Sequence, residues 1–549
     1  MHRAREIIEA FQHKKTERAT LSQLWEEVAG VLAPERVGFV GQPLSARRTE
    51  RIFDTVPITA KRGLVNAIGS MLRPKSSAPG KWFDIVPENE DLLEERDVKE
   101  WIEFAEERLW KALYNPKAKF IQATGEVDDD LITFGTGAGY LALRPDQVGL
   151  AFRSFHLANV YLITNAENDA VGVHIFERMT ARQAAQRWGE DNLGAKTRES
   201  LNDTNMRREE KFDFIWCVKE RHAYDQRRQN RVNMPYLSLV VDVASESEVL
   251  EEGYEEFPFF LPRWDTRSGE IYGRGPGIMA LPDVLTLNQM GKTMLRGLHR
   301  AVDPPWLLPS DGMVNAPQMR PGGVSYYDAK AIRNLGMSKP FMQMDSKANI
   351  PWGLSAQSAA REQIHALFYR NVLNLPVDAP QMTATEVIQR REEFVREIGA
   401  VFGRLESDYT GPLVERAFNI MLRRGAFGDI TQIPEALQGE SIQFRFASPV
   451  EKAKRQIEEA TVVQGIEKVI AIGQVQPSVM DPYDWVEIGK FIAESNDFPS
   501  ALTLDEAGIE DKQKAQAQAQ QQEQMMQTME RGAGIVSQLP EGVMEEEAA

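Results

Sequence analysis

TATEVIQRREEFVREIGAVFGRLESDYTGPLVERAFNIMLRRGAF, residues 383–427, is the stretch around which we expect the rest of this chain to be built. Thr383 and Glu386 have the spacing of a capping box at its start. About 45 residues at about 1.5 Å each span roughly 65 Å, so a helix of this length must pack against other helices, from its own chain or from neighbouring copies. Apolar side chains recur mostly three and four positions apart, which predicts one face of a helix: Val387, Phe394, Val395, Ile398, Val401, Phe402, Leu405 and Tyr409.

Two features divide and end this helix. Pro412 removes an amide hydrogen bond and clashes with the preceding turn, so it predicts a kink or the start of a second helix. Arg423, Arg424 and Gly425 predict a basic last turn followed by a stop.

Four arginines fall mostly between the apolar positions of the helix: Arg390, Arg391, Arg396 and Arg404. The simpler interpretation is a solvated face on which they pair with Glu392, Glu393 and Glu397. The functional interpretation is contact with DNA passing by, or with a neighbouring subunit. The sequence leaves both interpretations open.

Bulk properties limit the classes of function. The length of 549 residues suggests about three to four domains, and 42% hydrophobic residues suffice for real cores. A net charge of −17 argues against tight, non-specific DNA binding by the whole surface, although a local basic patch remains compatible with it. The single cysteine, Cys217, excludes an intrachain disulfide and a thiolate metal cage.

Targeting signals are also informative. The N-terminal stretch is charged and amphipathic and lacks the apolar core of a signal peptide. No apolar run approaches the roughly 18 residues that a membrane span needs. We therefore expect a soluble protein, with no membrane partner, that is made and used in a reducing compartment.

The remaining sequence predicts an α+β, helix-dominated fold. Helices and strands mix over the first 265 or so residues, with helices at 4–32, 57–72, 92–113, 120–134 and 181–189 and strands at 81–87, 151–163, 170–180 and within 211–264. Beyond GRGPG (273–277), which is typical of a hinge-like loop, we expect a helix of about 20 residues up to Arg300. Its inner stripe is Leu287, Met290, Met294 and Leu298.

A module rich in proline and glycine, 301–351, separates that helix from a second one at about 354–373. A lone strand at 439–449 is expected to return to the N-terminal sheet. Helices are expected at 450–473 and 484–495. A segment rich in Gln and Ala, 511–530, has low complexity, and the acidic end is expected to be disordered.

Several patterns imitate functional motifs. GKT at 291–293 lacks the glycine of a phosphate-binding loop, since Thr286 stands in its place, and FGTGAG at 134–139 departs from GxGxxG at Tyr140. Neither the histidines nor the serines have the spacing of a catalytic or metal site. We therefore expect no cofactor and no catalysis.

One acidic cluster requires an explicit choice. Glu126, Asp128, Asp129 and Asp130 are residue types that bind divalent metals. Adjacent acids on a helix point in different directions, however, which favours a solvated or interface face.

The order of these elements, and several stretches within it, resembles the portal, or head-to-tail connector, family of tailed bacteriophages, in particular the podovirus type. The resemblance covers nearly the whole chain. The stretches that carry it are FDTVPITAKRGLVNAIGSMLRP (53–74), KWFDIVP (81–87), DLITFGTGAGYL (130–141), GRGPGIMALPDVLTLNQM (273–290), LPVDAPQMTATEVIQRREEF (375–394) and FASPVEKAKRQ (446–456).

The resemblance implies a subunit with a mixed α/β wing, a helical stem, a small clip that contains strands, and a helical crown. Carried onto this chain, these regions are the wing at 1–272 with a return strand at 428–449, the stem helices at 273–300 and 352–373, the clip at 301–351, the channel loop at 374–382, the long wing helix at 383–427, and the crown and tail at 450–549.

The family also implies partners and sites. Expected partners are further copies in a ring of about twelve, double-stranded DNA in an axial channel, the terminase motor, major capsid and scaffolding proteins, tail adaptor proteins and internal virion proteins. The expected location is the portal vertex of the virion, after synthesis in the host cytoplasm. The channel-loop residues would be Asn374, Leu375, Pro376, Val377, Asp378, Ala379 and Pro380. The candidate clip contacts are Trp306, Tyr326, Tyr327 and Phe341.

Two other classes of protein compete with this interpretation. One is a metal-dependent nuclease or hydrolase that uses the acidic cluster near 126–130. The other is a helical scaffold oligomer unrelated to DNA.

Overall fold

The computed structural model forms two compact units. The first comprises residues 1–75, 108–426 and 446–453, and the second comprises 76–107, 427–445 and 454–549. The residues that the structure describes are 2–40, 51–73, 82–144, 149–202, 209–221, 224, 230, 232–310, 316, 318–328, 342–344, 349–370, 399, 401–428, 433–438, 442–446, 461–472, 476, 482–483, 485, 488–489, 491–492 and 514.

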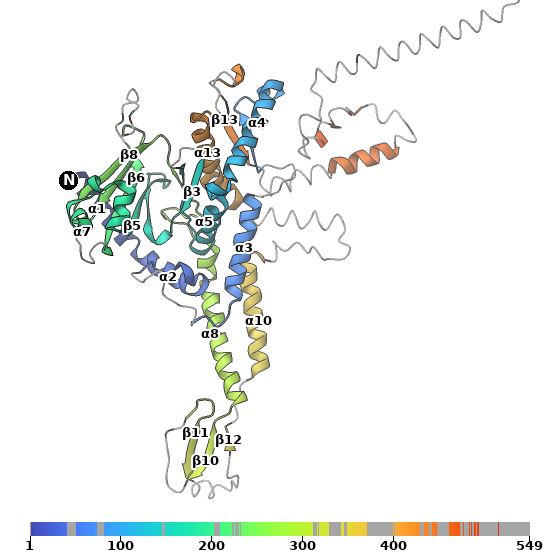
Figure 1. Ribbon diagram of the computed structural model, residues 1–549. Helices are drawn as coiled ribbons and strands as arrows, with labels where there is room; N and C mark the ends of the chain where they lie inside the picture. Colours follow the sequence, from blue (N-terminus) through green and yellow to red (C-terminus); the bar gives the residue numbers. More distant parts are fainter. Residues whose placement is uncertain are drawn as a thin grey trace, which may run out of the picture. The chain divides into compact units, whose positions relative to one another are not determined.

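A five-stranded antiparallel sheet forms one part of the first unit (Figure 1). Its strands follow the chain order: β4 (Val160–Thr164), β5 (Ala170–Thr180), β6 (Lys211–Glu220), β7 (Tyr236–Asp242) and β8 (Ser247–Tyr254). Helix α1 (His2–Glu17) packs its apolar face on this sheet, where Phe11 stacks with Phe176 and meets the edge of Tyr161. The predicted mixture of helices and strands in this region is therefore confirmed.

Helix α5 (Phe120–Phe134) lies at the centre of the first unit. Its residues from Val127 to Phe134 are buried, with the exception of Asp129, because other elements surround it. These elements are α2 (Ala19–Leu32), α3 (Val56–Leu72), α8 (Pro276–Val302) and the three-stranded sheet of β2 (Gly139–Leu143), β3 (Leu150–Ser154) and β9 (Phe259–Phe260).

The backbones at the end of α5 and the start of α8 touch directly. Gly135 has φ +85°, and a Cβ on it would collide with the backbone of residues 273–275. The Gly273 amide donates to Thr136 Oγ1 at 2.9 Å, and the Trp264 amide donates to the Gly135 carbonyl at 2.9 Å. GRGPG is therefore not the hinge that its composition suggests, because its glycines allow two backbones to interlock.

Helices α8 and α10 (Ile350–Leu367) run side by side as an antiparallel pair (Figure 1). A small sheet lies at their far end, formed by β10 (Trp306–Ser310), β11 (Val324–Asp328) and β12 (Met342–Gln343). Strand β10 is central, parallel to β11 and antiparallel to β12. Helix α8 is 27 residues long, rather than about 20, because Pro282 is accommodated within it.

The long predicted helix is described only from its second half, and Thr383 and Glu386 lie outside the described residues. A π-helical turn, Glu406–Thr410, precedes α13 (Gly411–Arg423), which has Pro412 in its first turn. Gly425 follows with φ +66°. Pro412 thus begins a second helix and Gly425 stops it, as predicted.

The second unit contains a two-stranded sheet of β1 (Phe83–Pro87) and β13 (Ile442–Phe446). The late strand does pair with an early one, but in a sheet of its own instead of the large sheet. Residues 461–472 are helical, and the predicted helix at 484–495 lies largely outside the described residues.

The other helical elements are short or surface elements. They are α4 (Arg96–Leu113), α6 (Ala181–Trp188), α7 (Ala195–Asn202) and the 3₁₀ turns Pro34–Arg36, Glu90–Glu94, Pro116–Ala118, Leu157–Asn159, Glu190–Asn192 and Glu435–Leu437. In the part of the chain that the structure describes, no helix combines the length and apolarity of a membrane span.

Candidate functional site

The acidic cluster on α5 pairs with three cations, two from α3 and its C-cap and one from the 3₁₀ turn at Pro34–Arg36. Lys61 of α3 lies 2.8 Å from Asp129, and Arg36 lies 3.1 Å from Asp130. Arg73, the residue after α3, forms an ion pair with Asp128. The carboxylates diverge around the helix, as predicted for adjacent acids, so that each meets a different base.

Asp128 also receives a hydrogen bond from the π-helical turn. The Tyr409 hydroxyl donates to its Oδ1 at 3.0 Å, and the Arg73 guanidinium lies over the Tyr409 ring at 4.9 Å. All three side chains are buried. Burial raises the pKa of Asp128, and the ion pair with Arg73 and the bond from Tyr409 oppose that rise.

Asp130 is also buried, and the charge of Arg36 offsets only part of the cost of burying its carboxylate. Burial raises its pKa to about 7, against the opposing effect of the Arg36 guanidinium. Glu126, at the start of the cluster, accepts a hydrogen bond from Ser154. Its carboxylate lies 3.8 Å from Arg36.

This geometry corrects the interpretation of the cluster. Two of its four acids are about 1% exposed and ion-paired, so it is neither a solvated face nor an open set of metal ligands. Across the described ranges, no group of three or more His, Cys, Asp and Glu residues is arranged to hold a metal ion. The arrangement joins α3, α5 and the π-helical turn into one core.

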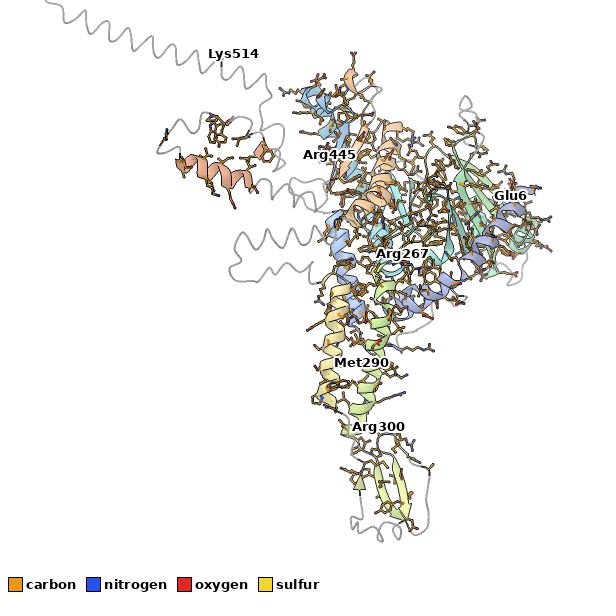
Figure 2. All side chains as sticks on the ribbon, turned by 180° about the vertical axis from the view of Figure 1, so that it is seen from behind. Glu6, Arg267, Met290, Arg300, Arg445 and Lys514 are labelled. Atoms are coloured by element: carbon orange, nitrogen blue, oxygen red, sulfur yellow. The ribbon has the colours of Figure 1, made fainter. Side chains whose placement is uncertain are left out.

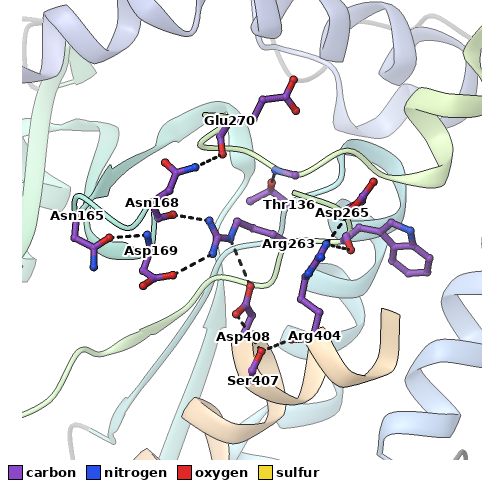
Figure 3. A network of polar contacts seen from close by, with 12 residues as sticks. Thr136, Asn165, Asn168, Asp169, Arg263, Asp265, Glu270, Arg404, Ser407 and Asp408 are labelled. Carbon is purple, nitrogen blue, oxygen red and sulfur yellow. Dashed lines mark hydrogen bonds and ion pairs between the residues drawn. The ribbon is translucent and has the colours of Figure 1, made fainter. Parts of the chain in front are cut away.

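A polar network ties the long helix to the sheet region (Figure 3). Arg404 donates to the Trp264 carbonyl at 3.3 Å and to Asp265 at 3.1 Å. Arg263 lies 3.5 Å from Asp408 of the π-helical turn and donates to the Asn168 carbonyl at 2.9 Å. Arg404 therefore has a partner within its own chain, and this partner is not one of the three glutamates considered from the sequence.

Most of the other predicted site residues lie outside the described residues. They are Arg390, Arg391, Arg396, Phe341 and the channel-loop residues 374–380. Their roles stay predictions.

The small sheet at the end of α8 and α10 presents two aromatic side chains on one face. Trp306 is 38% exposed and Tyr326 is 39% exposed. Tyr326 pairs with Leu308 in the parallel register, two positions from Trp306, so both aromatic residues share a face. Tyr327 alternates to the opposite face. The prediction that these aromatics bind partners remains open, but two of them are available at the surface.

A groove of about 530 Å³ lies between α8 and α10, and we call it the stem groove. Trp352 on α10, which is 72% exposed, is one of its walls. Its principal lining residues are Leu285, Met290, Thr293, Met294, Trp352 and Ala356. The predicted inner stripe of α8 is thus only partly correct, because Leu287 is buried while Met290 and Met294 line an open groove.

One row of side chains on α8 is basic. Lys292, Arg296 and Arg300 are spaced four residues apart, so they lie one above another on three successive turns. No ion pair joins them to any acid among the residues that the structure describes. We call these three side chains the basic stripe, and Figure 2 labels Arg300 at its end.

Reasoning from the sequence missed the stem groove and the basic stripe. The signal for the stripe was present in the i, i+4, i+8 spacing of three cations in an acidic protein. The groove could have been suspected from Trp352, since a tryptophan in the first turn of a helix after a proline-rich module has few intrahelical neighbours to cover it.

Comparisons with known proteins show which family the sequence matches. A family model for the bacteriophage head to tail connecting protein matches residues 4–503. The portal protein of Salmonella phage epsilon15 is 25% identical over 547 residues, which cover 97% of this chain and 95% of that protein. The probable portal protein of Bordetella phage BPP-1 is 27% identical over 477 residues, which cover 86% of this chain and 83% of that protein.

A chain in the solved virion of a native gene transfer agent particle aligns over 79% of this chain and 94% of its own length. Its TM-score is 0.35 at 11% identity, which is too low to establish a shared fold. The family match rests instead on sequence and spans nearly the whole chain. This protein belongs to the bacteriophage head-to-tail connecting protein family.

Proposed function

We propose that this protein is a phage portal: a ring of about twelve copies at one capsid vertex that forms the channel for packaging and ejecting double-stranded DNA. The observation that carries the proposal is the family match over residues 4–503. The similarity to the portal protein of phage epsilon15 and to the probable portal protein of phage BPP-1 supports the same function.

The antiparallel pair of α8 and α10 supports assignment of a stem, with the sheet of β10, β11 and β12 as the clip. The basic stripe supports a role in guiding DNA, because its Lys and Arg side chains have no ion pair with a described acid and can meet phosphates. Against a net charge of −17, such a stripe would guide the duplex without gripping it along its whole length.

The clip is proposed to dock the terminase motor during packaging and tail adaptor proteins afterwards. Trp306 and Tyr326 support this role, because exposed aromatic side chains are enriched at the centres of interfaces. The wing and crown would contact the capsid, scaffolding and internal virion proteins. The protein would be made in the host cytoplasm and carried in the virion.

The channel constriction is proposed to be the loop at 374–380. Charge reversal at Asp378 and deletion of 376–381 test this assignment in packaging and DNA-retention assays. Unchanged packaging and retention in both variants would contradict it.

The role proposed is structural. The motor ATPase of a portal vertex is a separate chain, in keeping with the missing glycine at Thr286. The paired state of the α5 acids also gives no support to a metal-dependent hydrolase.

Negative-stain electron microscopy and mass photometry of the purified protein test the central proposal. The expected result is a ring with a central hole and a mass near twelve times 62.0 kDa. A protein that stays monomeric even with scaffolding and capsid proteins present would overturn it.

A further inference from the structure

Helix α8 carries one continuous apolar stripe that the described residues of its own chain cover only halfway. The stripe runs through Val284, Leu287, Gly291, Leu295, Leu298 and Val302, at spacings of three and four. Val284 and Leu287 are about 2% and 0% exposed, whereas Leu295 and Leu298 are 42% and 37% exposed and Val302 is 86% exposed. We call the three exposed residues the ridge.

The cover ends at a definite place. Asn288 accepts a hydrogen bond from the Phe53 amide at 2.7 Å and donates to the Arg51 carbonyl at 2.9 Å, so residues 51–53 lie against α8 there. A Cβ on Gly291 would touch Phe53. One turn later, at Leu295, the stripe loses this cover among the described residues, and it continues as the ridge to the end of the helix.

The stem groove lies on the other side of the same helix. Thr293 lines the groove and Leu295 begins the ridge, and two positions on an α-helix differ by about 200° in direction. Trp352 lies at the same level along α8 as Thr293 and Leu295, because its neighbour Gly353 lies against Met294. Each copy therefore presents two apolar surfaces at the same level of α8: the concave stem groove on one side and the convex ridge on the opposite side.

We infer that the ridge of one copy packs into the stem groove of the next copy, against Trp352 and Met294. A head-to-tail contact between two different surfaces generates a ring when its rotation closes, which a self-complementary contact cannot do. Burial of exposed Leu, Val and Trp side chains supplies the driving force. The inference rests on the proposed ring and identifies its stem interface.

The basic stripe borders this proposed interface. Lys292, Arg296 and Arg300 each stand seven positions after a residue that lines the groove: Leu285, Gln289 and Thr293. Seven positions on an α-helix differ by only about 20° in direction, so the stripe continues the groove face toward the end of α8.

Two variants test the interface at exposed positions, where the fold of the monomer is not at risk. Thr293→Glu places a charge in the groove, and Leu298→Glu places one on the ridge. Each variant alone is expected to lose the ring, whereas Arg267→Gln, which removes an exposed charge outside α8, keeps it. An equimolar mixture of the two should yield a dimer near twice 62.0 kDa and nothing larger, because a single intact groove and ridge remain between them.

Cross-linking gives an independent readout on the assembled ring. The double variant Thr293→Cys/Leu295→Cys, treated with a short bis-maleimide, should give a ladder of covalent multimers under denaturing conditions. Each single variant should stay monomeric, since the native Cys217 is buried. Circular dichroism of every variant checks that the fold is retained.

The outcomes separate the two proposals. A wild-type protein that never forms rings contradicts the proposed function. If the wild type forms rings, then rings that persist in both glutamate variants, or a double-cysteine variant that gives no ladder, overturn this inference, because the groove and the ridge are then not the contact between copies. Dimers from a single-cysteine variant would show a self-complementary contact, which also overturns it.

Discussion

The Tyr409 hydroxyl donates to Asp128 Oδ1 at 3.0 Å and so joins two segments that are 281 positions apart in the sequence. The contact connects the π-helical turn of the long helix to the centre of α5. With Arg73 on the other carboxylate oxygen, it completes a buried triad that has no exposed member.

The first prediction concerns this hydroxyl. Tyr409→Phe keeps the ring packing on Phe260 but leaves a buried carboxylate short of one donor. We expect a loss of about 1–2 kcal/mol in the free energy of unfolding, seen as a lower melting temperature. Tyr483→Phe, at a half-exposed tyrosine, is the matched control and should leave the melting temperature unchanged.

The second prediction separates a structural triad from a metal site. Asp128→Ala leaves the Arg73 guanidinium buried without its anion and should cost roughly 3–5 kcal/mol. EDTA or added Mg²⁺ should not move the melting temperature of the wild-type protein. A stabilisation by Mg²⁺ that disappears in Asp129→Asn would instead favour metal binding by the cluster.

The third prediction is a pH dependence through His174. Burial, with Lys219 and Lys14 nearby, lowers its pKa to about 4, and its Nδ1 has no hydrogen-bond partner. Because the unfolded chain binds this proton at a higher pH, the stabilisation is complete above about pH 6.5 and is lost as the pH falls toward 4.

The wild-type protein should therefore lose roughly 2 kcal/mol of its free energy of unfolding through His174 when the pH falls from 7 to 5, and His174→Gln should not show this loss. The measurement is the melting temperature of both proteins at several pH values. Part of the acid sensitivity should remain, because burial also lowers the pKa of His156 to about 4. Asp130 has the opposite effect on stability: its pKa is raised, so its protonation stabilises the folded protein as the pH falls. Equal pH slopes in the two proteins would contradict the assignment.

The fourth prediction concerns the basic stripe. Replacement of Lys292, Arg296 and Arg300 by glutamine should weaken binding of a short duplex by the isolated ring and reduce its dependence on salt. The control removes the same charge elsewhere, at Arg62, Arg267 and Arg424, which are exposed and have no ion pair with a described residue. If both triple variants bind the duplex equally, the stripe does not contact DNA.

Local periodicity predicted much of the fold. The bounds of α5 and β5 agree with the sequence-based expectation, because each has a clean apolar pattern that ends at a glycine or at a helix cap. Helix α7 was missed, since AKTRESLN has a weak apolar face and follows a turn.

The site was less predictable because its contacts are distant in sequence. Nothing in the spacing of the α5 acids indicates that Arg36, Lys61 and Arg73 neutralise them, since those cations belong to other elements. The same holds for Met290 and Met294, whose periodicity suggests a core position while no described segment closes the groove that they line.

The interlocked glycines at the base of α8 have a mechanical consequence. A load on the small sheet is carried along a 27-residue lever arm to a support made of main chain against main chain, at Gly135 and residues 273–275. Side chains can yield by changing rotamer, but the closest contacts of this support are between main-chain atoms, which cannot. Helix α8 is therefore mounted as a stiff cantilever, and compliance between the small sheet and the body of the first unit must come from bending along the helix, in the stretch beyond Gly291, where residues 51–53 no longer cover it and α10 remains packed against it.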